Sequence, residues 1–133
     1  MLQANPKEFL IGLKAQTHCT AGMAAKYVGQ TGNEVTFAGA DGATACTADG
    51  FFVASVTGGV GARVATSGPM VAIAAAACSV GQYLMVADEF GRLAPADLAT
   101  ADVPLVAVAQ EAALALDDEI IITPIIPNQV AHG

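Results

Sequence analysis

The stretch that decides the fold is Val103–Pro127, VPLVAVAQEAALALDDEIIITPIIP. Two apolar runs, Leu105–Ala109 and Ile120–Ile126, flank a short alanine-rich segment and the paired carboxylates of Asp117 and Asp118. The second run is dense in β-branched residues, which are stiff at χ1 and pack well on a pleated surface. It is also short for a helix, so the stretch predicts two strands joined by a turn, on which the rest of the chain packs.

Prolines and glycines divide the chain into short strands. Pro124 cannot donate a hydrogen bond to a neighbouring strand, so its strand is predicted to lie at a sheet edge or to break there. Other strands are predicted at the following segments: Gly50–Thr57, Ala62–Ser67, Gln82–Ala87 and Arg92–Ala94. Turn residues at Gly58–Gly61 and Asp88–Gly91 separate them. Short strands at regular spacing predict an all-β fold, a small β-barrel or β-sandwich with an extended N-terminal arm.

Length and composition indicate one domain with a thin core. A chain of 133 residues buries roughly two-thirds of its unfolded surface, enough for its own core. The sequence is 54% hydrophobic but only 5% aromatic, with no Trp, so small side chains must fill that core. We expect contacts with a partner chain to complete it.

The distribution of cations and of strand and turn signals along the sequence predicts three parts. Residues 1–32 form an N-terminal arm, residues 33–127 the β domain, and residues 128–133 a C-terminal tail. The arm holds three of the five cations, namely Lys7, Lys14 and Lys26. A helical turn at Glu8–Leu13 would follow Pro6, because proline fits a first helical position.

Two interpretations of the N-terminal arm stay open. It is either a partly ordered terminus, which we favour, or a segment that orders against a neighbouring subunit. In both cases we expect deletion of Met1–Lys26 to leave the domain folded and to weaken binding to its partner.

The net charge of −7 excludes several classes of partner. Nucleic-acid binding needs clustered cations, and anionic membranes repel an acidic surface. Val64–Ala87 is uncharged and long enough to span a bilayer, but Gly68-Pro69 interrupts it and no cationic flank sets an orientation. Within it, Ala74–Ala77 fits either a short helix or a buried strand. No signal peptide is evident.

The three cysteines, Cys19, Cys46 and Cys78, are odd in number and widely spaced. This predicts free thiols that behave as small buried hydrophobes, and assembly in a reducing compartment. The neighbours His18 and Cys19 are two potential metal ligands, but no second pair follows at the spacing of a zinc site.

The sequence predicts no catalytic, cofactor-binding or metal-binding residue, and no cofactor. His18 and His132 lie near the chain ends, away from any recognisable nucleophile. Asp117-Asp118-Glu119 lacks the spacing of a calcium loop, so we interpret it as a solvated turn. The protein is therefore not expected to be an enzyme.

From about Phe37 to Pro127 the chain resembles the small capsid cement, or decoration, proteins of tailed bacteriophages. The resemblance rests on an ordered series of features: Ser67-Gly68, the apolar Val71–Ala77, Gly81-Gln82, Tyr83–Val86, the acidic-Gly-basic turn Asp88–Arg92, Val106–Ala112, Asp117-Asp118 and Glu119–Ile126. Three positions depart from the family pattern. Gln82 replaces the usual Asp, Ala107 replaces a Gly, and Asp117 stands where Gly is common.

The resemblance implies a structural protein on the outer capsid surface of the virion, assembled in the host cytoplasm. It would stabilise the assembled head by bridging subunits of the major capsid protein, as a homotrimer at three-fold and quasi-three-fold positions. It would bind neither nucleic acid nor membrane. The alternative is a structural subunit of a phage head fibre or tail, which would self-associate into a fibre. A carbohydrate-binding module fits less well, because sugar faces usually stack on aromatic rings.

Overall fold

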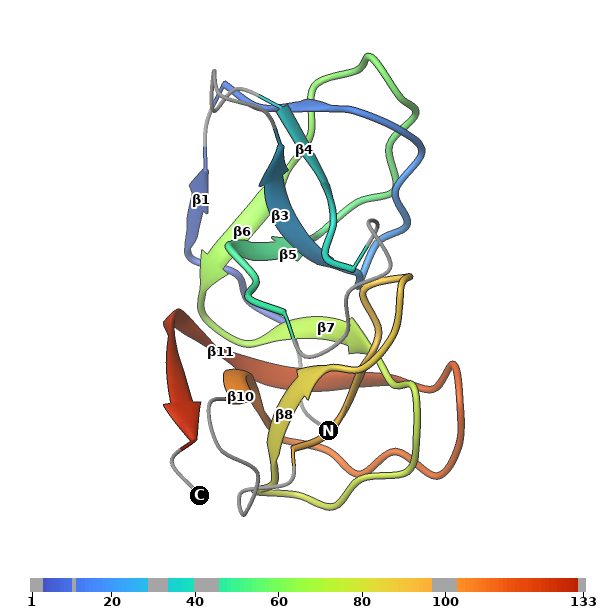
Figure 1. Cartoon of the computed structure of the whole chain (residues 1–133), viewed down its shortest axis with the longest axis vertical. Helices are drawn as coiled ribbons and strands as arrows, with labels where there is room; N and C mark the ends of the chain where they lie inside the picture. Colours follow the sequence, from blue (N-terminus) through green and yellow to red (C-terminus); the bar gives the residue numbers. More distant parts are fainter. Residues whose placement is uncertain (1–3, 11, 29–33, 40–45, 97–102, 132–133) are drawn as a thin grey trace.

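The protein is all-β in the computed structural model, which describes residues 4–10, 12–28, 34–39, 46–96 and 103–131. These residues form eleven strands in two sheets that pack like a β-sandwich (Figure 1). Neither sheet is a closed barrel. The predicted fold class is confirmed as an all-β, sandwich-like domain.

The first sheet has six strands in the order β1-β6-β5-β3-β4-β2. Its strands are β1 (Glu8–Leu10), β2 (Lys14–Ala15), β3 (Ala24–Val28), β4 (Glu34–Phe37), β5 (Gly50–Phe52) and β6 (Val64–Ser67). Neighbouring strands are antiparallel except β2 and β4, which are parallel.

The second sheet has five antiparallel strands in the order β7-β11-β10-β8-β9. They are β7 (Met70–Ile73), β8 (Tyr83–Val86), β9 (Leu93–Pro95), β10 (Val103–Ala109) and β11 (Glu119–Ala131). An isolated bridge between Ala74 and Leu93 brings the two edges of this sheet together. The sheet is therefore strongly curved, with one bridge rather than a continuous ladder between its two edges in the described part of the chain.

The stretch that decides the fold forms β10 and β11, which pair as predicted. β11 lies inside the sheet, yet its pairing changes at Pro124. On one side β7 pairs only with Glu119–Ile122. On the other side Pro124 faces Ala107, and the next paired residue of β11 is Gln129. The strand does not break at the proline, because β11 runs on to Ala131. Pro124 instead lies just past the residues that pair with β7, and the register with β10 shifts after it.

Phe51 and Phe52 on β5 point to opposite faces of the first sheet, and each belongs to a separate core. Phe51 lies in the core between the sheets, with many alanines and with Met70, Leu84 and Ile122. Phe52 lies in a second core, which the segments before β3 and before β6 help to form, with Leu13 and Val56 among its members. The prediction of a core of small side chains is confirmed.

The N-terminal residues contribute three strands to the first sheet. β1, β2 and β3 all belong to the first sheet, and β3 lies between β5 and β4. Cys19, Ala24 and Ala25 are fully buried. Glu8–Leu10 is a strand rather than a helical turn, because it pairs with β6 far along the chain. Long-range pairing thus overrides a weak local preference.

At the C-terminal end, β11 continues past Pro127 to Ala131. The side chain of Asn128 accepts a hydrogen bond from the Ala48 N–H at 2.8 Å and donates to the Ile125 carbonyl at 2.8 Å. Residues beyond Pro127 therefore tie the C-terminal strand to the segment before β5.

The uncharged stretch Val64–Ala87 contains β6, β7 and β8 rather than one long element. Ala74 makes a single bridge, and the three alanines after it are neither helix nor strand. Among the described residues, no helix is long and apolar enough to cross a membrane. The predicted loop at Asp97–Asp102 lies outside the described residues.

Candidate functional site

The turn between β8 and β9 is held by the carboxylate of Asp88. Its Oδ1 accepts hydrogen bonds from the N–H groups of Phe90 at 2.9 Å and Arg92 at 3.3 Å. Its Oδ2 lies 2.6 Å from Nε of Arg92. An Asp that bonds its own backbone two residues on is a known turn former. The turn predicted at Asp88–Gly91 is confirmed, and Gly91 has the positive φ of 69° that favours glycine.

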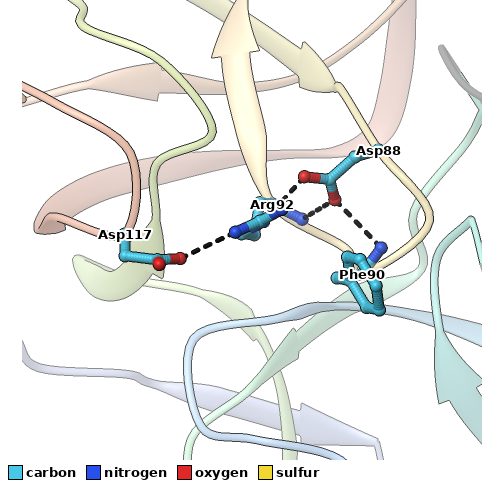
Figure 2. A network of polar contacts seen from close by, with 4 residues as sticks. All are labelled: Asp88, Phe90, Arg92 and Asp117. Carbon is cyan, nitrogen blue, oxygen red and sulfur yellow. Dashed lines mark hydrogen bonds and ion pairs between the residues drawn. The ribbon is translucent and has the colours of Figure 1, made fainter.

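Arg92 also reaches a second segment of the chain, the turn before β11. Its Nη1 lies 2.8 Å from Oδ1 of Asp117, so the guanidinium sits between two carboxylates (Figure 2). The hydrogen bond to Asp117, opposed by desolvation and aided by Asp88, raises the pKa of Arg92. The group therefore stays charged.

This pairing across the sequence was not predicted. The two residues lie 25 positions apart, so no local pattern indicates the contact. Asp117 has a φ of 71° and is a non-glycine residue in the left-handed region, which only a short polar side chain tolerates readily.

The same turn docks onto the first sheet. The Ala24 N–H donates to the Gly91 carbonyl at 2.9 Å, and a Cβ at Gly91 would lie 2.9 Å from the Ala24 carbonyl oxygen. Close by, the Ile73 N–H donates to the Gly22 carbonyl at 3.2 Å. The Arg92 network therefore lies at the seam between the two sheets.

A shallow hollow opens at this seam. It is lined by Thr20, Met23, Ile73, Phe90, Arg92 and Asp117. The guanidinium of Arg92 lies 5.3 Å from the centroid of the Phe90 ring, which stays partly exposed on the rim. Because the Arg92 cation already holds two carboxylates, the arrangement is better suited to joining two turns of the chain than to binding a charged ligand.

The pair of His18 and Cys19 does not form a common site. His18 is exposed, whereas Cys19 is fully buried. Burial, which outweighs a backbone hydrogen bond from Phe37, raises the pKa of the Cys19 thiol. Cys78 is buried as well, as expected for thiols that act as small hydrophobes. Within the described residues, no group of three His, Cys, Asp or Glu side chains could hold a metal ion.

The acidic run before β11 forms the predicted turn. Oδ2 of Asp118 accepts hydrogen bonds from the N–H groups of Leu114 at 2.7 Å and Ala115 at 3.1 Å. Asp117 faces Arg92, and Glu119 is exposed. The three carboxylates thus have different partners and do not converge on one point. His132 lies outside the described residues.

Comparison with models of known protein families gives no match, and neither does comparison with curated protein sequences. Among solved structures, the fold is similar to the crystal structure of the N base of the head fiber protein gp8.5 of bacteriophage phi29, with a TM-score of 0.65. The match covers 85% of this chain and 90% of that chain at 20% sequence identity. At this identity the likeness shows a shared fold. The fold is shared over most of the chain rather than over one motif.

Proposed function

We propose that this protein is a structural component of a phage head, attached to the outside of the assembled shell. The observation that carries the proposal is the fold shared with a head fiber base over 85% of the chain. The sequence features from Ser67 to Ile126 support it independently, because they follow the order found in phage decoration proteins.

The charge of the protein supports an exterior position. A net charge of −7 would repel packaged DNA at the inner surface of the shell. The same charge argues against nucleic acid and membranes as partners. The polar groups at the seam are engaged in holding chain segments, which supports a structural rather than a catalytic role.

In its more specific form, the proposal is that the protein cements the head by bridging subunits of the major capsid protein. Binding only to the assembled shell stabilises that shell by mass action. A homotrimer at three-fold and quasi-three-fold positions would match the symmetry of the lattice. A contact of roughly 800 Å² on each partner is sufficient for specific attachment.

The second candidate is the base of a head fibre. The specific observation in its favour is that the similar structure is itself a head fiber base. A fibre base needs one face for the shell and another for the fibre, whereas a cement protein needs contacts with several shell subunits.

The experiment adds the purified protein to mature shells that lack it and measures cosedimentation and the temperature of shell disruption. A cement protein binds saturably at the three-folds and raises the disruption temperature. A fibre base binds at a few positions and leaves that temperature unchanged. Failure to bind mature shells at all would contradict both forms of the proposal.

A further inference from the structure

The two sheets differ in net charge. The first sheet belongs to residues 1–69, which contain four of the five cations and four of the twelve carboxylates, so their net charge is zero. The second sheet belongs to residues 70–133, which contain Arg92 and the other eight carboxylates. These residues therefore carry the whole net charge of −7, and the cations are concentrated on the first sheet.

Two cations and an aromatic ring lie on one face of the first sheet, near β1. Phe9 lies opposite Ala65, and Lys14 lies opposite Gly61. Arg63 comes midway between those two partners. Side chains alternate along a strand and opposed residues share a face, so Phe9, Lys14 and Arg63 point to the same side. Their neighbours point to the other side, into the second core: Leu13, Ala15 and Val64.

The two cations have no carboxylate partner in the described structure. Lys14 and Arg63 are both exposed, and among the described residues Arg92 alone makes ion pairs. Glu34 is paired with Lys14 along the backbone, but no ion pair joins their side chains. The guanidinium of Arg63 lies 5.2 Å from the centroid of the Phe9 ring, which is 38% exposed. We call Phe9, Lys14 and Arg63 the cationic patch.

The cationic patch borders an open strand edge. β1 is the outermost strand of the first sheet, on the left in Figure 1, and among the described strands it pairs with β6 alone. Lys7 lies at one end of β1, where its N–H donates to the Ser67 carbonyl at 3.0 Å. Glu8 is the one carboxylate of β1, and it points away from the side of Phe9. An unpaired edge is a template for another extended chain.

We propose that the cationic patch and the edge of β1 bind an extended, carboxylate-rich segment of another protein. The segment pairs with the backbone of β1, and its carboxylates meet Lys14 and Arg63. The charges favour this occupant over a second copy at the same edge, because two β1 edges would bring cations together. The excess negative charge belongs to the residues of the second sheet, so it does not cancel the attraction at close range.

The inference concerns a different contact from the proposed function and is tested without any shell. The probe is a blocked peptide of alternating Glu and Thr, titrated into the full chain and followed by the amide shifts of its NMR spectrum. Binding should shift the amides of Glu8–Leu10 and Val64–Ser67, and it should weaken as sodium chloride rises from about 0.05 to 0.3 M. A peptide of alternating Gln and Thr has the same backbone without the charges and should bind less tightly.

The variant Lys14→Gln with Arg63→Gln should raise the dissociation constant of the Glu–Thr peptide at least about fivefold, because it removes two ion pairs. Val80→Glu with Leu116→Glu is the matched control. It lowers the net charge by the same amount, at exposed positions on turns of the second sheet. It should bind the peptide like the wild type. Circular dichroism verifies that each variant is folded.

Equal binding of the Glu–Thr and Gln–Thr peptides, or no binding of either, would overturn the inference. So would equal weakening in the two double variants, or amide shifts that avoid β1 and β6. Self-association of the wild type that disappears in the Lys14→Gln, Arg63→Gln variant would identify a second copy as the occupant and would also contradict it. None of these outcomes depends on shell binding, so the proposed function stands or fails separately.

Discussion

Arg92 binds Asp117 across 25 positions of the sequence, with Nη1 and Oδ1 2.8 Å apart, and so joins the turn between β8 and β9 to the turn before β11. Its other contact, Nε to Asp88 at 2.6 Å, lies within its own turn and is better shielded. The side chains of Arg92 and Asp88 are 20% and 24% exposed, whereas that of Asp117 is 67% exposed. The long-range ion pair is therefore the weaker of the two, because solvent screens it.

We expect Asp117→Gly to be more stable than Asp117→Ala by about 1 kcal/mol, because both lose the ion pair but only Ala strains the left-handed backbone. The φ of 71° at this residue is the basis of the prediction. Urea denaturation of the two variants measures the difference in the free energy of unfolding. Equal stabilities would mean that the backbone at Asp117 relaxes in the variants.

Arg92→Ala should cost roughly 1–3 kcal/mol in the free energy of unfolding, because it leaves Asp88 partly buried with one charged partner fewer. Asp117→Asn is the matched control, since it keeps a polar side chain at positive φ and removes only the exposed ion pair. It should cost less than about 1 kcal/mol. Arg92→Ala removes both ion pairs, so equal losses in thermal or urea denaturation would show that the contact with Asp88 adds no measurable stability.

Gly91→Ala should be more destabilising than Gly59→Ala. Both glycines have positive φ, 69° and 87°. A Cβ at Gly91 would meet the Ala24 carbonyl oxygen at 2.9 Å, whereas one at Gly59 meets nothing within 4 Å. We expect about 1–2 kcal/mol for Gly59→Ala, and about 1–3 kcal/mol more for Gly91→Ala, because the turn must move away from β3. Chemical denaturation measures both, and similar losses would show that the docking of the turn is not tight.

Local patterns in the sequence predicted those parts of the fold that local chemistry determines. The β-branched run in β11 and the turn at Asp88–Gly91 both depend on the preferences of nearby residues. The N-terminal strands could not be predicted in this way, because Glu8–Leu10 is fixed by its pairing with β6. The Arg92–Asp117 contact was missed for the same reason, since it depends on how two distant turns meet at the seam.

Cys19 should react slowly with maleimide in the folded protein, because its thiol is buried and burial raises its pKa. The thiolate is the reacting species, so both effects slow the reaction. The raised pKa also makes a stability contribution, which is fully present below the ordinary thiol pKa and lost as the pH rises through the raised one. Peptide mapping after labelling, with and without urea, measures the rate at Cys19. Equal rates in both conditions would contradict its burial.

Deletion of Met1–Lys26 should prevent folding, contrary to what the sequence alone led us to expect. The deletion removes β1, β2 and the first half of β3, and β3 pairs with both β4 and β5 in the middle of the first sheet. It also removes Leu13, Cys19, Ala24 and Ala25 from the buried cores. Strands that lose a partner expose unpaired backbone groups and apolar surface, so the remaining chain should aggregate or stay unfolded.

The matched control for this truncation is deletion of Met1–Ala4, which keeps all described strands and the hydrogen bond from the Asn5 N–H to the Pro69 carbonyl at 2.7 Å. Circular dichroism and thermal melts of both variants provide the measurement. The short deletion and the whole chain should both melt cooperatively, and the long deletion should show no cooperative transition. A cooperative melt for the chain that starts at Tyr27 would show instead that the second sheet and the rest of the first form a domain without the N-terminal strands. Residues 1–32 would then be a separable arm after all.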